Sequence, residues 1–187
     1  MSSVRKMCIC AICTAMCYVL PQAFHVLPLG VALSPMHLPV LLCGLVCGWP
    51  YGLFCGLLGP VLSYLLSGMP PAPVLISMAP ELGVYGLTAG LGMKLIHTGK
   101  TVPDIYLSLL PALLLGRIAG GAAKVLFYLS TAESYTVAMW VSSYVVGTLP
   151  AIVLQLILLP VLVWALTGAR VIPARYLPKE TLTASAK

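Results

Sequence analysis

Long apolar runs, separated by short stretches rich in proline, glycine or basic residues, make up most of this chain. Four of these runs cover about Met7–Leu20, Val74–Ile96, Ile105–Tyr128 and Val137–Leu166. A membrane-spanning helix needs about 20 mostly apolar residues. The runs therefore predict the first, fourth, fifth and sixth spans of a membrane protein.

The stretch Ser34–Pro60 is equally apolar but is interrupted by several glycines and prolines and carries His37. Two short helical halves with such breaks must pack against protein rather than lipid, because free backbone groups are costly in hydrocarbon. They predict the second and third spans, joined by Trp49-Pro-Tyr-Gly as a tight cytoplasmic turn. We therefore expect an all-α membrane protein with six transmembrane helices, in a single domain over residues 1–187.

Composition excludes a soluble globular domain, since 60% of the 187 residues are hydrophobic, 7% are charged and the mean hydropathy is +1.05. The net charge of +6 could suggest a nucleic-acid partner, but the cations sit at the ends of apolar runs. This positive-inside pattern predicts cytoplasmic N- and C-termini, with about 170–187 as a basic tail. The residues that orient the chain are Arg5, Lys6, Lys94, Lys100, Arg170 and Arg175.

The seven cysteines lie in or beside apolar runs, where packing is a commoner role than a disulfide framework. Cys10 and Cys13 have a Cys-x-x-Cys spacing but no second pair, so we expect no metal site. No phosphate-binding loop sequence is present, so we expect neither a cofactor nor ATP hydrolysis by this chain.

The run Gly68-Met-Pro-Pro-Ala-Pro lacks charge and cannot be helical, which predicts a stiff external loop between the third and fourth spans. We interpret Met69, Pro70 and Pro71 as a lid over a cavity. On the first span, Ala11-x-x-x-Ala15 places small side chains one turn apart, so another helix can approach closely. This face serves either internal packing or docking of a partner.

Three charges fall well inside predicted spans, away from their cytoplasmic ends and at one depth in the membrane: Glu81, Arg117 and Lys124. Arg117 and Lys124 are close to two turns apart and share a helix face with Tyr128. Charges at such depth are by default a functional-site hypothesis. A structural ion pair between Glu81 and either cation is the alternative, but two cations against one anion leave a surplus that a ligand carboxylate would neutralise.

His37 lies at the external start of the second span, near the expected cavity mouth, and completes the candidate site. The candidate substrate-binding residues are His37, Glu81, Tyr85, Arg117, Lys124 and Tyr128.

Several of these stretches together resemble the substrate-binding S component of the energy-coupling factor (ECF) vitamin transporters of bacteria, over nearly the whole chain. They are Ala11-x-x-x-Ala15, Ser34-Pro-Met-His-Leu-Pro-Val-Leu-Leu, Gly68-Met-Pro-Pro-Ala-Pro and Met78-Ala-Pro-Glu-Leu-Gly-Val-Tyr-Gly-Leu. The resemblance implies a subunit of the cytoplasmic membrane that binds a vitamin or precursor from outside and topples to release it inward.

The resemblance also implies partners: a transmembrane T component, contacted through Ala11 and Ala15, and two ATP-binding-cassette ATPases. The surplus positive charge favours a substrate with a carboxylate, such as pantothenate or nicotinate. Two other classes stay open, a small intramembrane enzyme and a stand-alone channel or structural membrane protein. The first would need a nucleophile with a base, or a metal, and the polar set offers neither.

Overall fold

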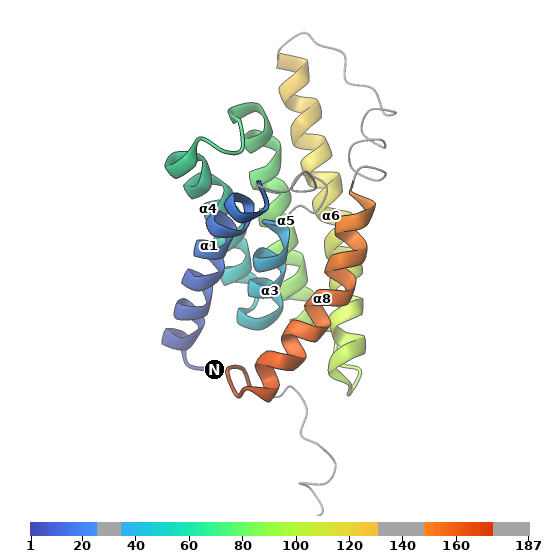
Figure 1. Ribbon diagram of the computed structural model, residues 1–187. Coiled ribbons are helices and arrows are strands. Elements are labelled where there is room, and N and C mark those ends of the chain that lie inside the picture. The colour runs from blue at the N-terminus through green and yellow to red at the C-terminus, as the bar shows by residue number, and fades with distance from the viewer. Residues whose placement is uncertain (26–34, 131–147, 174–187) are drawn as a thin grey trace, which may run out of the picture.

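The computed structural model describes residues 1–25, 35–130 and 148–173, and every regular element in these ranges is a helix (Figure 1). The helices are α1 (Ser3–His25), α3 (His37–Cys47), α4 (Trp49–Ser67), α5 (Ala72–Leu95), α6 (Thr101–Ser130) and α8 (Leu149–Gly168). The predicted all-α class is therefore confirmed.

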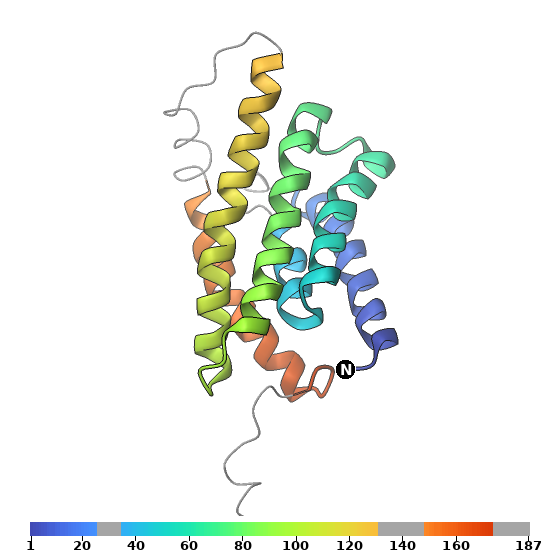
Figure 2. The same ribbon diagram turned by 180° about the vertical axis from the view of Figure 1, so that it is seen from behind.

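The short helix α3 lies at the centre and contacts each of the other five described helices. On one side α1 packs against α3 and α4, and on the other α8 packs against α3 and α6. Behind them α5 packs against α4 and α6 (Figure 2). The N-terminus, the α5–α6 connection and the end of α8 lie at one end of the bundle, and the α4–α5 connection lies at the other.

Five helices are long and apolar enough to cross a membrane, while α3 has only 11 residues. At 1.5 Å per residue α3 measures about 17 Å, little more than half of a bilayer core. Most of its side chains are buried, so α3 packs inside the protein as the sequence predicted for this stretch. Six complete spans and cytoplasmic termini stay predictions.

Glycines explain how α3, α4 and α5 pack so closely around one another. A Cβ placed on Gly44 would lie 2.5 Å from the carbonyl oxygen of Gly86, and one on Gly52 would also collide with that oxygen. Gly56 meets the backbone of Leu82 in the same way. Small residues let helix backbones approach in this manner, so the glycines of the central stretch serve helix packing.

The turn between α3 and α4 is at Gly48, which has φ +96°, a conformation that favours glycine. The prediction that Trp49-Pro-Tyr-Gly forms the turn is wrong, because these residues are the first turn of α4. Pro50 suits that position, where a backbone N–H would have no helical partner. The two halves of the central stretch thus meet one residue before the predicted turn.

Other predicted boundaries also shift. The first helix continues past Leu20 to His25, with Pro21 inside it. In the last predicted span the helix begins only at Leu149, because Thr148 has a non-helical ψ of 8° and Pro150 occupies the first turn. Residues 137–147 of that span lie outside the described residues, as do Ser34 and the tail from residue 174, which includes Arg175.

The cysteines serve packing, as the sequence indicated. The thiol of Cys17 donates to the carbonyl oxygen of Met36 at 3.8 Å, and that of Cys47 donates to the carbonyl oxygen of Lys6 at 3.6 Å. These contacts join α1 to both ends of α3. The buried cysteines are Cys13, Cys17, Cys43, Cys47 and Cys55.

Candidate functional site

A buried polar cluster joins the start of α3 to the middle of α5. The hydroxyl of Tyr85 donates to Glu81 Oε1 at 3.0 Å, and His37 Nε2 lies 3.6 Å from the same oxygen. The rings of His37 and Tyr85 meet edge to face, with centroids 5.2 Å apart. At most 7% of the surface of any of these residues is exposed. Three of the predicted site residues therefore lie in mutual contact.

Two glycines of α6 make the space for this cluster. A Cβ on Gly116 would lie 2.5 Å from Cδ1 of Tyr85, and one on Gly120 would lie 2.7 Å from Oε2 of Glu81. The two positions are one helical turn apart, so they form a hollow strip on the face of α6 that meets α5. Because Gly120 contacts Glu81, the acid lies beside the part of α6 that directly follows Arg117.

Arg117 extends from α6 toward α8 rather than toward the acid. Its Nη1 donates to Oγ1 of Thr148, at the start of α8, while its buried Nε has no hydrogen-bond partner. Only 8% of the residue is exposed. Within the described ranges a hydroxyl holds this buried guanidinium and one of its donors is left free.

Glu81 contacts His37 and Tyr85, and neither cation lies within 4.0 Å of its carboxylate in the described part of the chain. The alternative prediction, an ion pair between Glu81 and Arg117 or Lys124, is therefore wrong. The reason is geometric, because Gly120 separates the two cations along α6 and faces Glu81 with its backbone.

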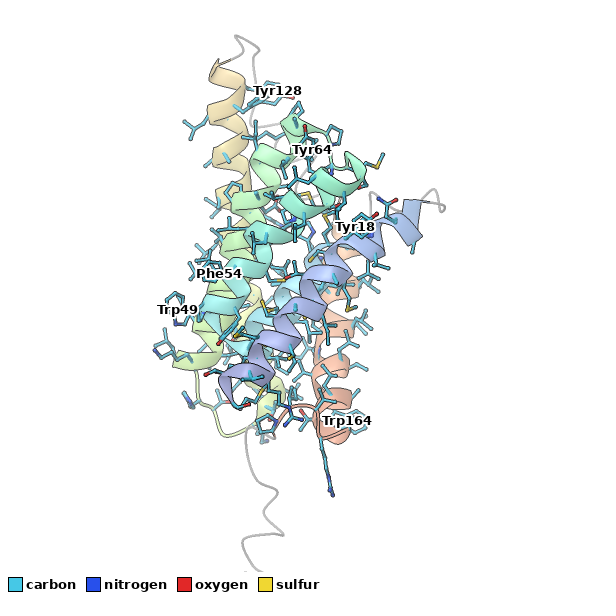
Figure 3. All side chains as sticks on the ribbon, turned by 90° about the vertical axis from the view of Figure 1, so that its left-hand side faces the viewer. Tyr18, Trp49, Phe54, Tyr64, Tyr128 and Trp164 are labelled. Carbon is cyan, nitrogen blue, oxygen red and sulfur yellow. The ribbon has the colours of Figure 1, made fainter. Side chains whose placement is uncertain are left out.

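Lys124 and Tyr128 lie further along α6 and are half-buried. Figure 3 places Tyr128 near the end of α6 that projects beyond the other helices. Tyr128 is three turns from Arg117, about 16 Å along the axis. The structure thus assembles His37, Glu81 and Tyr85, directs Arg117 toward α8, and leaves Lys124 and Tyr128 nearer the end of the bundle.

Gln155 is a residue that the sequence reasoning missed. It is 1% exposed, and neither Oε1 nor Nε2 of its amide has a hydrogen-bond partner. It lies two turns after Thr148, so it occupies the same inward face of α8 that meets α3 and α6. An amide within an otherwise apolar span was the signal that could have found it.

The two remaining predicted features lie on the surface. Met69, Pro70 and Pro71 connect α4 to α5 outside any helix, while Ala72 and Pro73 already belong to α5, which shortens the predicted loop. Its role as a lid stays a prediction. Pro73 is tolerated there because a first helical turn needs no N–H from it.

The small-residue face of α1 points outward. Ala11 and Ala15 are exposed, whereas Cys13 and Cys17 on the other face are 2% and 0% exposed and pack into the core. The internal-packing interpretation of Ala11 and Ala15 is therefore wrong for the described residues. A small, exposed helix face leaves room for another helix.

Comparison with known families decides the class. Residues 5–163 match the model of the family described as ECF transporter, substrate-specific component. This chain belongs to that family. No curated protein and no solved structure matched it.

As an ECF substrate-specific component, the chain is a multi-pass membrane protein and a substrate-specific subunit of a transporter, rather than an enzyme. Membership also implies a small-molecule substrate, and T and ATPase partners in a membrane complex. The resemblance drawn from the sequence motifs is thereby confirmed.

Proposed function

We propose that this subunit captures a water-soluble vitamin or vitamin precursor that carries a carboxylate, and delivers it to the cytoplasm with a T component and two ATPases. The observation that carries the proposal is Arg117, a buried guanidinium with a free Nε and no acidic partner among the described residues. A ligand carboxylate would supply the missing anion and accept from that donor.

Other buried polar groups inside the bundle also favour a ligand site. His37 Nδ1 and both amide atoms of Gln155 are buried without partners. Each unmade hydrogen bond of this kind costs about 1–3 kcal/mol, so a ligand that satisfies them gains binding energy. Their mixed donor and acceptor character suits a substrate with hydroxyl, amide or ring-nitrogen groups beside its carboxylate.

The ordered contacts around Glu81 give this site a fixed wall. The hydroxyl of Tyr85 and the ring of His37 hold its carboxylate, and Gly120 presses against it. Groups locked in this way need little rearrangement when a ligand arrives, which favours affinity. We infer that Glu81 orients His37, whose Nδ1 then faces the substrate.

Delivery requires contact with the T component, and we propose Ala11 and Ala15 as its docking face. Their exposure and small size support this role. We further propose six spans, cytoplasmic termini, and an external loop at Met69–Pro71 that closes over the bound substrate.

Uptake in cells tests this function. The test uses cells that cannot take up pantothenate or nicotinate by themselves. They would express the chain either alone or with the T component and the two ATPases from the same source organism as the chain. We expect ATP-dependent accumulation of one radiolabelled acid only with all partners present, and no accumulation with an ATPase whose catalytic glutamate is replaced. Equal accumulation without partners would indicate a stand-alone channel instead.

A further inference from the structure

A recess that contains two lysines lies at the end of the bundle that holds the N-terminus, away from Arg117 and Glu81. Its volume is about 380 Å³, and α1, α3, α4 and α5 each supply part of its wall. The lining residues that matter here are Lys6, Trp49, Tyr51, Met93 and Lys94. The proposed transport site uses none of them.

Two lysines from different helices face this recess. Lys6 Nζ lies 5.9 Å from the centroid of the Tyr51 ring, and Lys94 lies exposed in the last turn of α5. Neither lysine has an acid within 4.0 Å in the described ranges. Asp104, near this end, is buried and accepts from Thr98 instead. Within the described part of the chain, the recess is therefore a site of uncompensated positive charge.

The lysines, rather than a helix end, supply the attraction for an anion. Helix α3 ends and helix α4 begins at Gly48, which also lines the recess. The partial negative charge at the end of α3 and the partial positive charge at the start of α4 therefore offset each other. Replacing the lysines should then remove most of the anion affinity.

The surroundings of the recess suit a lipid. Trp49 at its rim and Phe54, about one turn further along α4, are 39% and 61% exposed and lie on the same outer side of the bundle (Figure 3). Leu95, beside Lys94, is 75% exposed. Acyl chains can lie along these apolar side chains while a headgroup reaches the lysines, and aromatic residues are typical of that depth.

We propose that this recess binds the phosphate of an anionic phospholipid headgroup from the membrane leaflet at that end. Basic pockets between transmembrane helices bind such headgroups, and an apolar strip leading from the pocket adds the acyl contacts that free phosphate lacks. An acidic segment of a partner protein could use the lysines but would not need the exposed Phe54 and Leu95. The lipid therefore fits more of the observed surface.

Binding of phosphatidylglycerol to the purified full chain tests this proposal, with phosphatidylcholine and inorganic phosphate as comparison probes. Native mass spectrometry would count bound lipids for the native chain and for Lys6→Met, Lys94→Met and the double variant. Methionine keeps the apolar stem of each lysine and removes its charge. Lys100→Met is the matched control, because Lys100 is exposed at the same end but does not line the recess.

We expect each recess substitution to weaken phosphatidylglycerol binding about 5-fold and the double variant about 25-fold, with Lys100→Met unchanged. If Lys6→Met does not fold, Lys94→Met alone decides. The proposal would be overturned if the chain bound phosphatidylcholine or inorganic phosphate as tightly as phosphatidylglycerol. It would also be overturned if the lysine variants bound lipid normally and lost only their assembly with protein partners.

Discussion

Gly116 of α6 lies directly against the ring of Tyr85 of α5, and a Cβ at Gly116 would come within 2.5 Å of two ring carbons. This contact fixes how far α5 and α6 can approach and which residues sit side by side. Because Tyr85 also donates to Glu81, the same contact sets the height of the buried acid relative to Arg117. The site geometry therefore depends on a glycine that carries no polar group.

Gly116→Ala should destabilise the protein, because the added methyl group forces the Tyr85 ring and α5 outward. Overpacking of this kind costs about 1–3 kcal/mol, which thermal unfolding in detergent would register as a lower Tm. Gly168→Ala is the control, because nothing lies within 4 Å of a Cβ there, and its Tm should not fall. Equal Tm values for both variants would contradict the close contact.

Tyr85→Phe should lower stability by about 1–3 kcal/mol, because it leaves a buried carboxylate oxygen of Glu81 with one partner fewer. The ring packing against Gly116 is retained, so the effect isolates the hydroxyl. Tyr106→Phe serves as the control, since Tyr106 is 37% exposed. Chemical denaturation in detergent gives both values, and a neutral Tyr85→Phe would show that the hydrogen bond contributes nothing.

Ala11→Trp and Ala15→Trp should abolish uptake while leaving substrate binding to the isolated subunit intact, because a bulky side chain on the exposed face keeps the T component away. Co-purification of the T component should fail in parallel. Ile157→Trp, on the exposed face of α8, controls for a general effect of a new tryptophan at the lipid surface. Normal uptake by both alanine variants would place the docking face elsewhere.

Membrane topology is tested by labelling single introduced cysteines in a cysteine-free background. A cysteine at Met69 should react with an impermeant reagent from outside, and one at Lys100 should react only after the cells are opened. Met69 is in the α4–α5 connection and Lys100 is in the α5–α6 connection, and these connections lie at opposite ends of the bundle, so we expect opposite results. External labelling at Lys100 would reverse the proposed orientation.

Much of this architecture could be predicted from the sequence, because the length of an apolar run and the positions of proline and glycine determine local helix formation. The central stretch divides into two helices because Gly48 and Pro50 specify a turn and a helix start. The start of the last helix was harder to predict, since the apolar pattern continues upstream of Leu149 and periodicity alone does not mark where a helix begins.

The site could be predicted only in part, because contacts between helices depend on how each helix is rotated about its axis and where it lies along the bundle. The sequence placed Glu81 and Arg117 at one depth, but not that Gly120 would separate the acid from both cations. Nor could it predict that Thr148 would hold Arg117, since that bond joins residues 31 positions apart. The sequence shows Gln155 as an amide in an apolar span, but only the packing of α8 shows that it faces inward.

The central claim, that Arg117 binds a substrate carboxylate, is tested most directly by equilibrium binding of an acid and its neutral analogue to the purified chain. The pairs are nicotinate with nicotinamide and pantothenate with panthenol, measured on the native chain, Arg117→Met and Lys124→Met, with Tm recorded for each. We expect the native chain to prefer one acid, and Arg117→Met to bind that acid about 10- to 150-fold more weakly, with little change in Tm. A lower Tm for Arg117→Met, with equal loss of affinity for the acid and its neutral analogue, would show instead that Arg117 only supports the fold.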